Sequence, residues 1–392
     1  MSTTATARPA LTTFSEDEQM FRDAVAAFAD DEVRPRVQAM ERASKIDPEL
    51  LPKYFELGLM GIEVPEQYGG AGGSLTMVAI AVEEISKIDA SAAIVCDVQN
   101  TLVNYPISRY ASDAQRAKYL PRLVGDTIGA YALSEPGSGS DVFAAQCRAT
   151  RDGDGWRIDG TKMFTSGANF TDYVFMLTRT DPDAVKHKGL TMFLVPLKAK
   201  GVTVQPVHTF QDERTNITFY DGVRVPDSYR LGPVNEGSKT MAAGLELEHG
   251  GGFSKVQRAM LKAAVQLCRE LKRQGRPLIE QPQAQARLAR SAANLIVSDM
   301  FTFRAIWASV QKQPNAGFGP MAKMYSSEKF LSDSRDFLDL TAPESLSKRA
   351  GAAGFLNQCY RHAQGTTIYG GTSEVHRSMI AERALGMPRT RG

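Results

Sequence analysis

Several features are scarce in this 392-residue sequence, and each scarcity excludes a class of protein. Neither sign of charge dominates, because 46 Lys and Arg residues stand against 44 Asp and Glu residues, so a nucleic-acid or anionic-membrane partner is not expected. No apolar run approaches the length of a bilayer span, and residues 1–10 lack the apolar core of a secretory signal. These absences indicate a cytoplasmic protein with no membrane partner.

Cysteine and histidine are also few. Cys96, Cys147, Cys268 and Cys359 lie far apart and have neither metal-binding nor redox spacing. We expect four reduced thiols, as in a cytoplasmic protein. The five histidines form no cluster, so no metal site is expected. The chain is long enough for two or three domains and a large core.

Hydrophobic periodicity divides the chain into three parts. Residues 1–126 follow a helical period that begins at a capping box formed by Ser15 and Glu18. Residues 127–234 carry short alternating runs between Asp-Gly turn signals, which indicates a small antiparallel β domain. Helical periodicity returns over residues 235–392. The predicted fold class is therefore mainly α with a central small antiparallel β domain, and a ligand is expected between the sheet and the last helical domain.

The stretch Tyr131–Asp141 reads Tyr-Ala-Leu-Ser-Glu-Pro-Gly-Ser-Gly-Ser-Asp. Its proline and two glycines exclude regular structure and allow a tight loop with positive φ. Three serine hydroxyls lie beside backbone N–H groups that no strand uses. Such a loop can bind a planar heteroaromatic ring or a phosphate through donors alone. From composition only, a surface turn is the alternative.

Three further segments carry candidate chemistry. Phe164-Thr165-Ser166-Gly167 follows a predicted turn at Asp159-Gly160, although a core strand is the alternative for this segment. Tyr369–Glu374 precedes an amphipathic helix, and Thr372 lies where an N-cap would direct donors toward a ligand. The fourth segment, Gly244–His249, lies on a long predicted helix.

Together these four segments resemble the acyl-CoA dehydrogenase family over essentially the whole chain. The family's architecture is an α domain, a β domain and a C-terminal four-helix bundle, with limits here at 1–126, 127–234 and 235–392. The resemblance implies FAD as cofactor, an acyl-CoA thioester as substrate and α,β-dehydrogenation in fatty acid β-oxidation. It also implies that an electron-transfer flavoprotein accepts the electrons.

The resemblance assigns roles to the motif residues. Phe164 would stack on the flavin ring, and Ser166 would donate a hydrogen bond near the reactive flavin nitrogen. The residues implied for cofactor binding are Tyr131, Leu133, Ser134, Gly139, Ser140, Phe164, Ser166, Thr372 and Glu374. The residues implied for substrate binding are Ser140, Glu246, His249, Tyr369 and Gly370.

The sequence departs from the commonest family pattern at the catalytic base. Gly370 fills the slot where most members carry Glu, and glycine cannot remove a proton. Isovaleryl-CoA dehydrogenase-like members place the carboxylate on the long helix instead, where Glu248 matches. Glu246 lies two residues away and points to roughly the opposite face. We therefore predict that Glu248 removes the α-proton, once hydrogen bonds to the thioester carbonyl acidify the α-carbon. A solvated helix charge is the alternative for this residue.

Further departures concern the pocket and the neighbouring subunit. His249 replaces a family Arg, and the run Gly250–Gly252 is unfavourable in a helix by roughly 1 kcal/mol per Gly, which suggests a kink or a wide cavity for a bulky acyl group. In the family, an Arg-x-x-Phe-Gly and a Gln-x-x-Gly-Gly segment contact the neighbour's FAD. Leu271–Gly275 and Asp339–Pro343 replace them here.

Two assemblies remain open because the half-site supplied to a neighbour is altered. The expected one is a homo-oligomer, a dimer or tetramer, that holds the FAD tail through Arg273 or Arg276. The other is a hetero-oligomer with one FAD per pair.

Three functions compete with the main one: a dehydrogenase of carrier-protein-bound acyl groups, a flavin monooxygenase on the same fold, and a subunit that only completes a partner's FAD site. Glu248 argues against the second and third. The sequence does not specify the acyl group.

Overall fold

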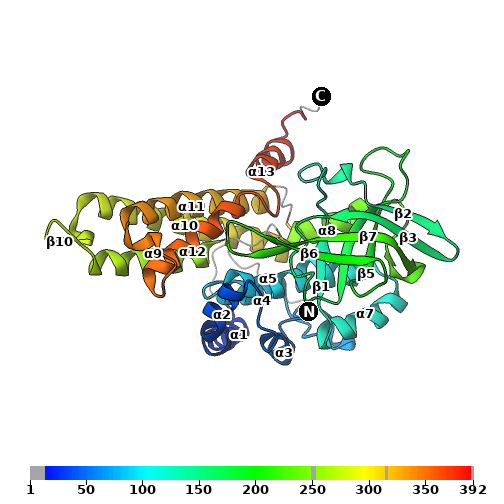
Figure 1. The fold of residues 1–392 in the computed structure, drawn as a ribbon, viewed down its shortest axis with the longest axis horizontal. Coiled ribbons are helices and arrows are strands. Elements are labelled where there is room, and N and C mark those ends of the chain that lie inside the picture. Colours follow the sequence, from blue (N-terminus) through cyan, green and yellow to red (C-terminus); the bar gives the residue numbers. More distant parts are fainter. Residues whose placement is uncertain (1–13, 249–252, 314–316, 390–392) are drawn as a thin grey trace, which may run out of the picture. The chain divides into compact units, whose positions relative to one another are not determined.

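The structure, a computed structural model, describes residues 14–248, 253–313 and 317–389. Contacts between residues divide the chain into two compact units (Figure 1). The sheet unit comprises Ala27–Ile85 and Ser91–Glu248, and the bundle unit comprises Met1–Ala26, Ser86–Ala90 and His249–Gly392.

The first helix begins where the sequence predicts. In the capping box before α1 (Glu16–Phe28), the Ser15 N–H donates to the Glu18 carboxylate at 2.8 Å, and the Glu18 N–H donates to the Ser15 hydroxyl at 3.2 Å. Pro35 lies in a 3₁₀ turn, η2 (Arg34–Arg36), between the π-helical turn η1 (Ala29–Val33) and α2 (Val37–Ala43). The helix type therefore changes at this proline, because proline cannot donate to the preceding turn.

Buried amide side chains connect the helices of the sheet unit to its first strand. The Gln99 Nε2 donates to the Leu123 carbonyl at 2.7 Å, and its Oε1 accepts from the Gly129 N–H at 2.9 Å. These bonds fix where β1 leaves the helical layer, since buried polar groups need partners. The helices are α3 (Leu50–Glu56), η3 (Glu66–Tyr68), α4 (Leu75–Ser86), α5 (Ala90–Asp97), η4 (Val98–Asn104), α6 (Tyr105–Tyr110), α7 (Asp113–Gly125) and, after the sheet, α8 (Gly237–Glu248).

Within the described residues, eight strands form one sheet in the order β6-β7-β3-β2-β4-β5-β8, with β1 beside β4. Most pairings are antiparallel, as predicted, but β1 pairs with β4 in parallel, and β2 makes one parallel pairing with β4. The parallel pairing of β1 with β4 is possible because residues 133–172 connect the two strands, which is a long crossover and not a hairpin turn. The strands are β1 (Gly129–Ala132), β2 (Arg148–Asp152), β3 (Gly155–Lys162), β4 (Tyr173–Arg179), β5 (Leu190–Pro196), β6 (Val202–His208), β7 (Arg214–Pro226) and β8 (Arg230–Leu231).

The predicted turn at Asp159-Gly160 is wrong. Gly160 lies inside β3 at a bulge, with a φ of +144°. A Cβ on Gly160 would lie 2.8 Å from the Cys147 Cα, so the glycine permits a close approach of two strands and does not form a turn. The turn between β2 and β3 is at Gly153, whose φ is +63°.

The central strands are buried on both faces. On one side, Phe175 of β4 packs in an apolar cluster with Leu120 of α7. On the other side, Val174 packs with Ile158 of β3. A strand covered on both sides reads as a continuous apolar run, which explains the sequence of β4 and β5.

The bundle unit contains four long helices around one apolar core that includes Met260, Phe330 and Phe337. They are α9 (Ser254–Glu270), α10 (Pro282–Val310), α11 (Phe318–Leu340) and α12 (Ala352–Thr366), and they confirm the four-helix bundle (Figure 1). A short hairpin, β9 (Lys272–Arg273) and β10 (Arg276–Pro277), follows α9. The remaining elements are η7 (Leu278–Glu280), η8 (Glu344–Leu346), α13 (Ser373–Met379) and η9 (Ile380–Ala384).

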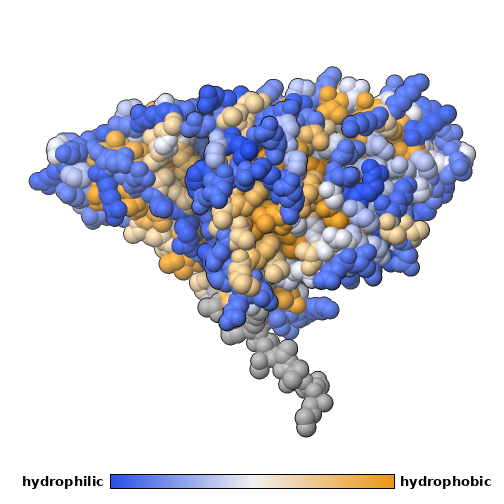
Figure 2. Space-filling model, turned by 90° about the horizontal axis from the view of Figure 1, so that it is seen from below, coloured by the Kyte–Doolittle hydropathy of each residue, from blue (hydrophilic) through white to orange (hydrophobic). Residues whose placement is uncertain are grey.

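Three further features concern the thiols, the possible metal ligands and the helix lengths of the described chain. All four cysteines are free and buried. In the described part of the chain, no group of His, Cys, Asp and Glu could hold a metal ion, and no helix there is long and apolar enough to cross a membrane. The surface in Figure 2 is mostly hydrophilic with apolar areas between. The exposed apolar side chains of the described chain include Ile296 and Met300, about one helical turn apart on α10.

Candidate functional site

A buried ion pair fixes the loop that follows β1. The Lys162 ammonium, whose side chain is 0% exposed, lies 2.7 Å from the Glu135 carboxylate and donates to the Leu133 carbonyl at 2.9 Å. Glu135 also accepts from the N–H groups of Gln146 at 2.7 Å and Cys147 at 3.0 Å. Each charge is therefore compensated, which a buried charge requires, and the loop is tied to strand β3.

The tip of the loop is a tight turn with open space around it. Glu135 and Ser138 exchange two backbone hydrogen bonds at 2.8 and 3.1 Å, and the Ser138 hydroxyl donates to the Asp141 carbonyl at 2.8 Å. A Cβ added at Gly139 would meet nothing within 4 Å. No hydrogen bond within the described chain engages the hydroxyl of Ser140, which is exposed. The loop thus keeps donors and room for a ligand.

The loop lies directly beside the second motif. The Met163 N–H donates to the Ser134 carbonyl at 2.8 Å. Phe164 follows, with a side chain that is 57% exposed. Its φ of +59° is a strained backbone conformation for a residue other than glycine, unfavourable by ~1–3 kcal/mol. Asn216 binds Thr165 through two hydrogen bonds. Its backbone carbonyl accepts from the Thr165 N–H at 2.8 Å, and its side-chain amide donates to the Thr165 carbonyl at 3.0 Å. The fold therefore holds an aromatic ring outward on a rigid segment.

The other predicted cofactor residues of the sheet unit lie on the same elements. Tyr131 and Leu133 are half-buried at the end of β1 and just after it. Ser166 is exposed, and its Oγ is 3.3 Å from the Thr215 Oγ1 on β7. A platform of one exposed aromatic ring, several hydroxyls and open glycines fits a flavin.

The third motif is a glycine turn in the bundle unit. Thr372 is the N-cap of α13, as predicted, and its hydroxyl accepts from the Val375 N–H at 3.2 Å. Gly370 and Gly371 both have left-handed backbones, with φ of +62° and +88°. The hydroxyl of Ser373 is buried and has no hydrogen-bond partner in the described chain, so a polar ligand atom is a fitting partner.

Two buried side chains hold the carbonyls of this turn. The Lys323 ammonium, on α11, donates to the Gly371 carbonyl at 2.7 Å and to the Thr366 carbonyl at 2.8 Å. The His376 Nε2 is 3.0 Å from the Gly370 carbonyl. Burial lowers the pKa of His376 to about 4, and the nearby Lys323 charge adds to this effect. His376 is therefore neutral at pH 7, and its Nε2 carries the proton that is donated.

The residues on either side of the turn are exposed. Tyr369 is 37% exposed, and its hydroxyl is 3.3 Å from the His362 Nε2. Glu374 is exposed, and hydrogen bonds from its own backbone N–H and from the Thr372 hydroxyl lower its pKa. A carboxylate stabilised in this way is a weak base, so Glu374 is a poor substitute for the missing base at Gly370.

The predicted base lies at the edge of the described chain. Glu248 is the last residue of α8. The side chains of Glu246 and Glu248 lie outside the described residues, as do His249 and Gly250–Gly252. Their roles stay predictions.

The segments that replace the neighbour-binding motifs are joined to each other. The Arg273 guanidinium donates to Glu344 at 2.6 Å and to the Ala342 carbonyl at 2.7 Å, and it lowers the pKa of Glu344. Arg287 forms an ion pair with Asp339 at 2.6 Å. Arg273, one candidate for holding a neighbour's FAD, is thus engaged within the chain.

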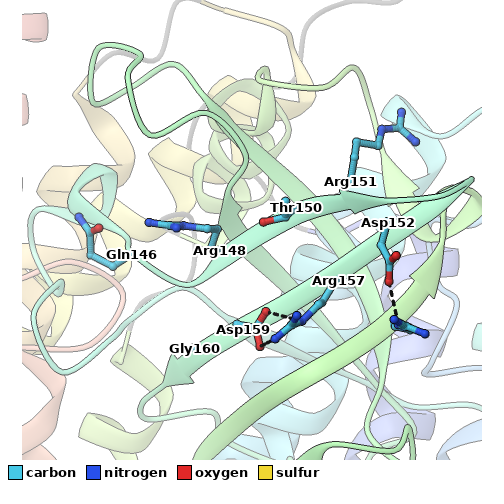
Figure 3. A pocket seen from close by; sticks show the side chains of 9 residues that line it. Gln146, Arg148, Thr150, Arg151, Asp152, Arg157, Asp159 and Gly160 are labelled. Carbon is cyan, nitrogen blue, oxygen red and sulfur yellow. Dashed lines mark hydrogen bonds and ion pairs between the residues drawn. The ribbon is translucent and has the colours of Figure 1, made fainter.

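An open groove of about 680 Å³ covers the outer face of β2, β3 and β7 (Figure 3). Two of its arginines are paired within it, because Arg157 lies 3.0 Å from Asp159 and Arg224 lies 2.7 Å from Asp152. None of the predicted site residues lines it, and we interpret it as a solvated ionic face. Its lining is Gln146, Arg148, Thr150, Arg151, Asp152, Arg157, Asp159, Gly160 and Arg224.

The structure groups the predicted residues within each unit and adds anchors that the sequence reasoning missed. Glu135 lies inside the segment Tyr131–Asp141 and His376 lies two residues after the segment Tyr369–Glu374, but neither was assigned a role. Lys162, Asn216 and Lys323 carry no local signal, because a lysine or asparagine is usually exposed and only the packing reveals its burial.

Comparisons with known proteins agree along the whole chain. Three family models match: "Acyl-CoA dehydrogenase, N-terminal domain" over residues 15–126, "middle domain" over 130–219 and "C-terminal domain" over 247–385. The short/branched chain specific acyl-CoA dehydrogenase of Bos taurus mitochondria is 31% identical over 383 residues, which cover 95% of this chain and 86% of that protein.

Two solved structures are similar throughout. The ChsE4-ChsE5 complex from Mycobacterium tuberculosis is 28% identical, with a TM-score of 0.87 and coverage of 97% of this chain and 100% of that chain. The Tcur3481-Tcur3483 steroid ACAD is also 28% identical, with a TM-score of 0.86 and coverage of 96% and 99%.

Proposed function

The chain belongs to the acyl-CoA dehydrogenase family, whose members are FAD-dependent oxidoreductases, and we propose that it desaturates a bulky acyl-CoA thioester with Glu248 as the base. The observation that carries the proposal is the Gly/Ser loop bonded to the segment that exposes Phe164. FAD, when bound, would supply the acceptor for the hydride that leaves the β-carbon. The chain's own residues bind, orient and deprotonate the substrate.

We assign the cofactor to the motif residues of both units. Phe164 stacks on the ring, and the hydroxyls of Ser134 and Ser166 offer hydrogen bonds to its polar edge. Tyr131, Leu133, Gly139 and Ser140 complete the platform of the sheet unit, and Thr372 and Glu374 bind the nucleotide portion. The three family matches support domain limits of 1–126, 127–234 and 235–392 as part of this proposal.

Substrate binding is proposed for Ser140, Glu246, His249, Tyr369 and Gly370. The N–H of Gly370 has no acceptor within the described chain and can donate to the thioester carbonyl. That bond acidifies the α-carbon, so that Glu248 can remove the α-proton. The base lies on α8 because Gly370 has no side chain and a left-handed backbone that disfavours Glu.

The acyl group is proposed to be branched or polycyclic. The run Gly250–Gly252 beside Glu248 removes side-chain volume, and the similar Tcur3481-Tcur3483 protein is described as a steroid enzyme. The test is anaerobic flavin bleaching with CoA thioesters that range from butyryl through branched to polycyclic, together with a carrier-protein-bound thioester. A protein that contains FAD but is bleached by none of them would overturn the proposal.

For the assembly, we propose a hetero-oligomer with one FAD per pair. Arg273 is paired with Glu344, and an acidic residue, Asp339, stands where the family has Gln. The apolar pair Ile296 and Met300 on α10 offers a contact for a partner subunit. The competing homo-oligomer rests on Arg276, which is exposed and unpaired within the described chain.

The assembly test measures FAD per chain and mass in solution for the chain purified alone and with a related subunit. A chain that is free of FAD when purified alone, and that binds FAD only after the related subunit is added, supports the hetero-oligomer. One FAD per chain in a homodimer or homotetramer contradicts it. A cytoplasmic location and an electron-transfer flavoprotein as acceptor belong to the same proposal. The four free thiols support the former.

A further inference from the structure

The Gly370–Gly371 turn is held from its carbonyl side by two side chains of the bundle unit. Lys323 comes from α11 and His376 from α13, and both are buried, with exposed fractions of 4% and 0%. They contact consecutive carbonyls, those of Gly371 and Gly370. Two buried polar side chains directed at two adjacent peptide groups require an explanation, because ordinary turns leave such carbonyls to solvent.

Lys323 connects three elements at one point. Its ammonium donates to the Thr366 carbonyl at the end of α12 and to the Gly371 carbonyl before α13. A cation is favourable at a helix C-terminus, where unsatisfied carbonyls concentrate negative charge. The same ammonium lies 5.8 Å from the centre of the Tyr369 ring, so it contacts the motif on both sides of Gly370. Its position therefore depends on α12, and the position of the turn depends on Lys323.

His376 fixes the turn from the opposite end. A Cβ on Gly371 would lie 2.9 Å from the His376 Nε2, so the ring packs directly on the glycine backbone. The ring is neutral at pH 7, as its lowered pKa indicates, and it donates one hydrogen bond to the Gly370 carbonyl. A rotated turn would lose this bond and leave a buried donor unpaired, which is unfavourable by ~1–3 kcal/mol.

These contacts leave the other side of the turn available. With both carbonyls engaged, the N–H groups of Gly370 and Gly371 have no acceptor within the described chain. The hydrogen bond to the Gly370 carbonyl also polarises the peptide group that this carbonyl shares with the Gly371 N–H, which strengthens that N–H as a donor. The arrangement thus polarises the Gly371 N–H, whereas it acts on the Gly370 N–H by fixing the backbone of the turn.

We propose that Lys323 and His376 are positioning residues that lock the Gly370–Gly371 turn, so that the Gly370 N–H is held ready for the thioester carbonyl. The inference rests on the proposed function, because it takes Gly370 as a substrate-binding residue. Neither side chain contacts the substrate in this scheme. Both act through the turn, and their effect is therefore on the rate at saturating substrate more than on binding.

The experiment uses the FAD-loaded assembly and the thioester that bleaches the wild-type flavin fastest. His376→Leu removes the donor, whereas His376→Gln places an amide N–H at about the reach of Nε2. Lys323→Met keeps the length of the side chain and removes its charge, and Lys329→Met is the matched control on the same helix. Flavin content, KM, the anaerobic flavin reduction rate at saturating substrate and the Tm are measured for each.

We expect His376→Leu and Lys323→Met to retain FAD and to reduce the flavin roughly tenfold to 100-fold more slowly, with KM changed less than about threefold. His376→Gln should recover a rate within about threefold of wild type, and Lys329→Met should match wild type. A full rate in His376→Leu, or a His376→Gln variant as slow as His376→Leu, would overturn the inference. A wild-type flavin that no thioester bleaches would instead contradict the proposed function.

Discussion

The loop after β1 and the turn before α13 are both rich in glycine and hydroxyl residues, but they are anchored differently. The loop is anchored by a buried ion pair in which Lys162 meets Glu135, a residue of the loop itself. The turn is anchored by Lys323 and the neutral His376, which bind backbone carbonyls. An ion pair fixes one side chain of a flexible loop, whereas carbonyl contacts fix the orientation of peptide groups. We infer that the loop provides shape and the turn provides oriented donors.

The largest effect is expected at the predicted base, which neither anchor replaces. Glu248→Gln should bind FAD and thioester but lower flavin reduction by ~10²–10⁴-fold, because a positioned general base contributes that much. Anaerobic stopped-flow reduction measures it. Glu246→Gln is the control and should retain far more activity. The reverse order of the two variants would place the base on the other face of α8.

The buried ion pair between Lys162 and Glu135 should contribute strongly to the stability of the fold. Lys162→Met leaves the buried Glu135 carboxylate without its counter-charge and should lower the free energy of unfolding by ~3–5 kcal/mol. Urea unfolding monitored by circular dichroism measures it. The control, Lys198→Met, changes a side chain that is 89% exposed and should have almost no effect. Equal midpoints for both variants would show that the Lys162–Glu135 ion pair adds no net stability.

Removal of the exposed ring tests the platform beside the loop. Phe164→Ala should weaken FAD binding about tenfold, because an aromatic contact contributes ~0.5–1.5 kcal/mol beyond its area. The fold should be unaffected, since the ring is 57% exposed. The dissociation constant of FAD is measured by fluorescence titration. Phe210→Ala, with a side chain 64% exposed on the β6–β7 turn, is the control, and equal losses would argue against stacking by Phe164.

The smallest effect concerns the acid sensitivity of the turn. The pKa of His376 is lowered from 6.5 to about 4 in the folded protein, so the unfolded chain binds more protons between these values. This residue therefore stabilises the fold above pH 6.5, and its contribution is lost as the pH falls toward 4. Between pH 7 and pH 5.5 the loss is about 1 kcal/mol.

Urea unfolding of wild type and His376→Gln at pH 7 and pH 5.5 isolates the contribution of His376, because the two proteins share all other titratable groups. The variant should lose about 1 kcal/mol less stability than wild type on acidification. Identical pH dependence would mean that the pKa of His376 is the same in the folded and the unfolded protein, which would contradict the burial effect assigned to this ring.

Much of the fold was predictable because its signals are local. The capping box at Ser15 and Glu18, the hairpin turn at Gly153 and the N-cap Thr372 all depend on residues a few positions apart. The FAD family was predictable for the same reason, since its motifs are short and specific. The roles of the individual site residues stay predictions, because no described contact reports on a ligand.

The sequence by itself determined the order of helical and β segments, because period and capping are encoded in neighbouring residues. Only the tertiary structure decided which polar residues became anchors and where glycine was needed for packing. Gly160 has the local signal of a turn, yet the approach of Cys147 makes it a strand bulge. Lys162 and Lys323 have the composition of surface residues, yet carbonyls and a carboxylate brought from distant segments bury them. Such partners lie tens of residues away in the chain, where neither hydrophobic period nor turn propensity carries information.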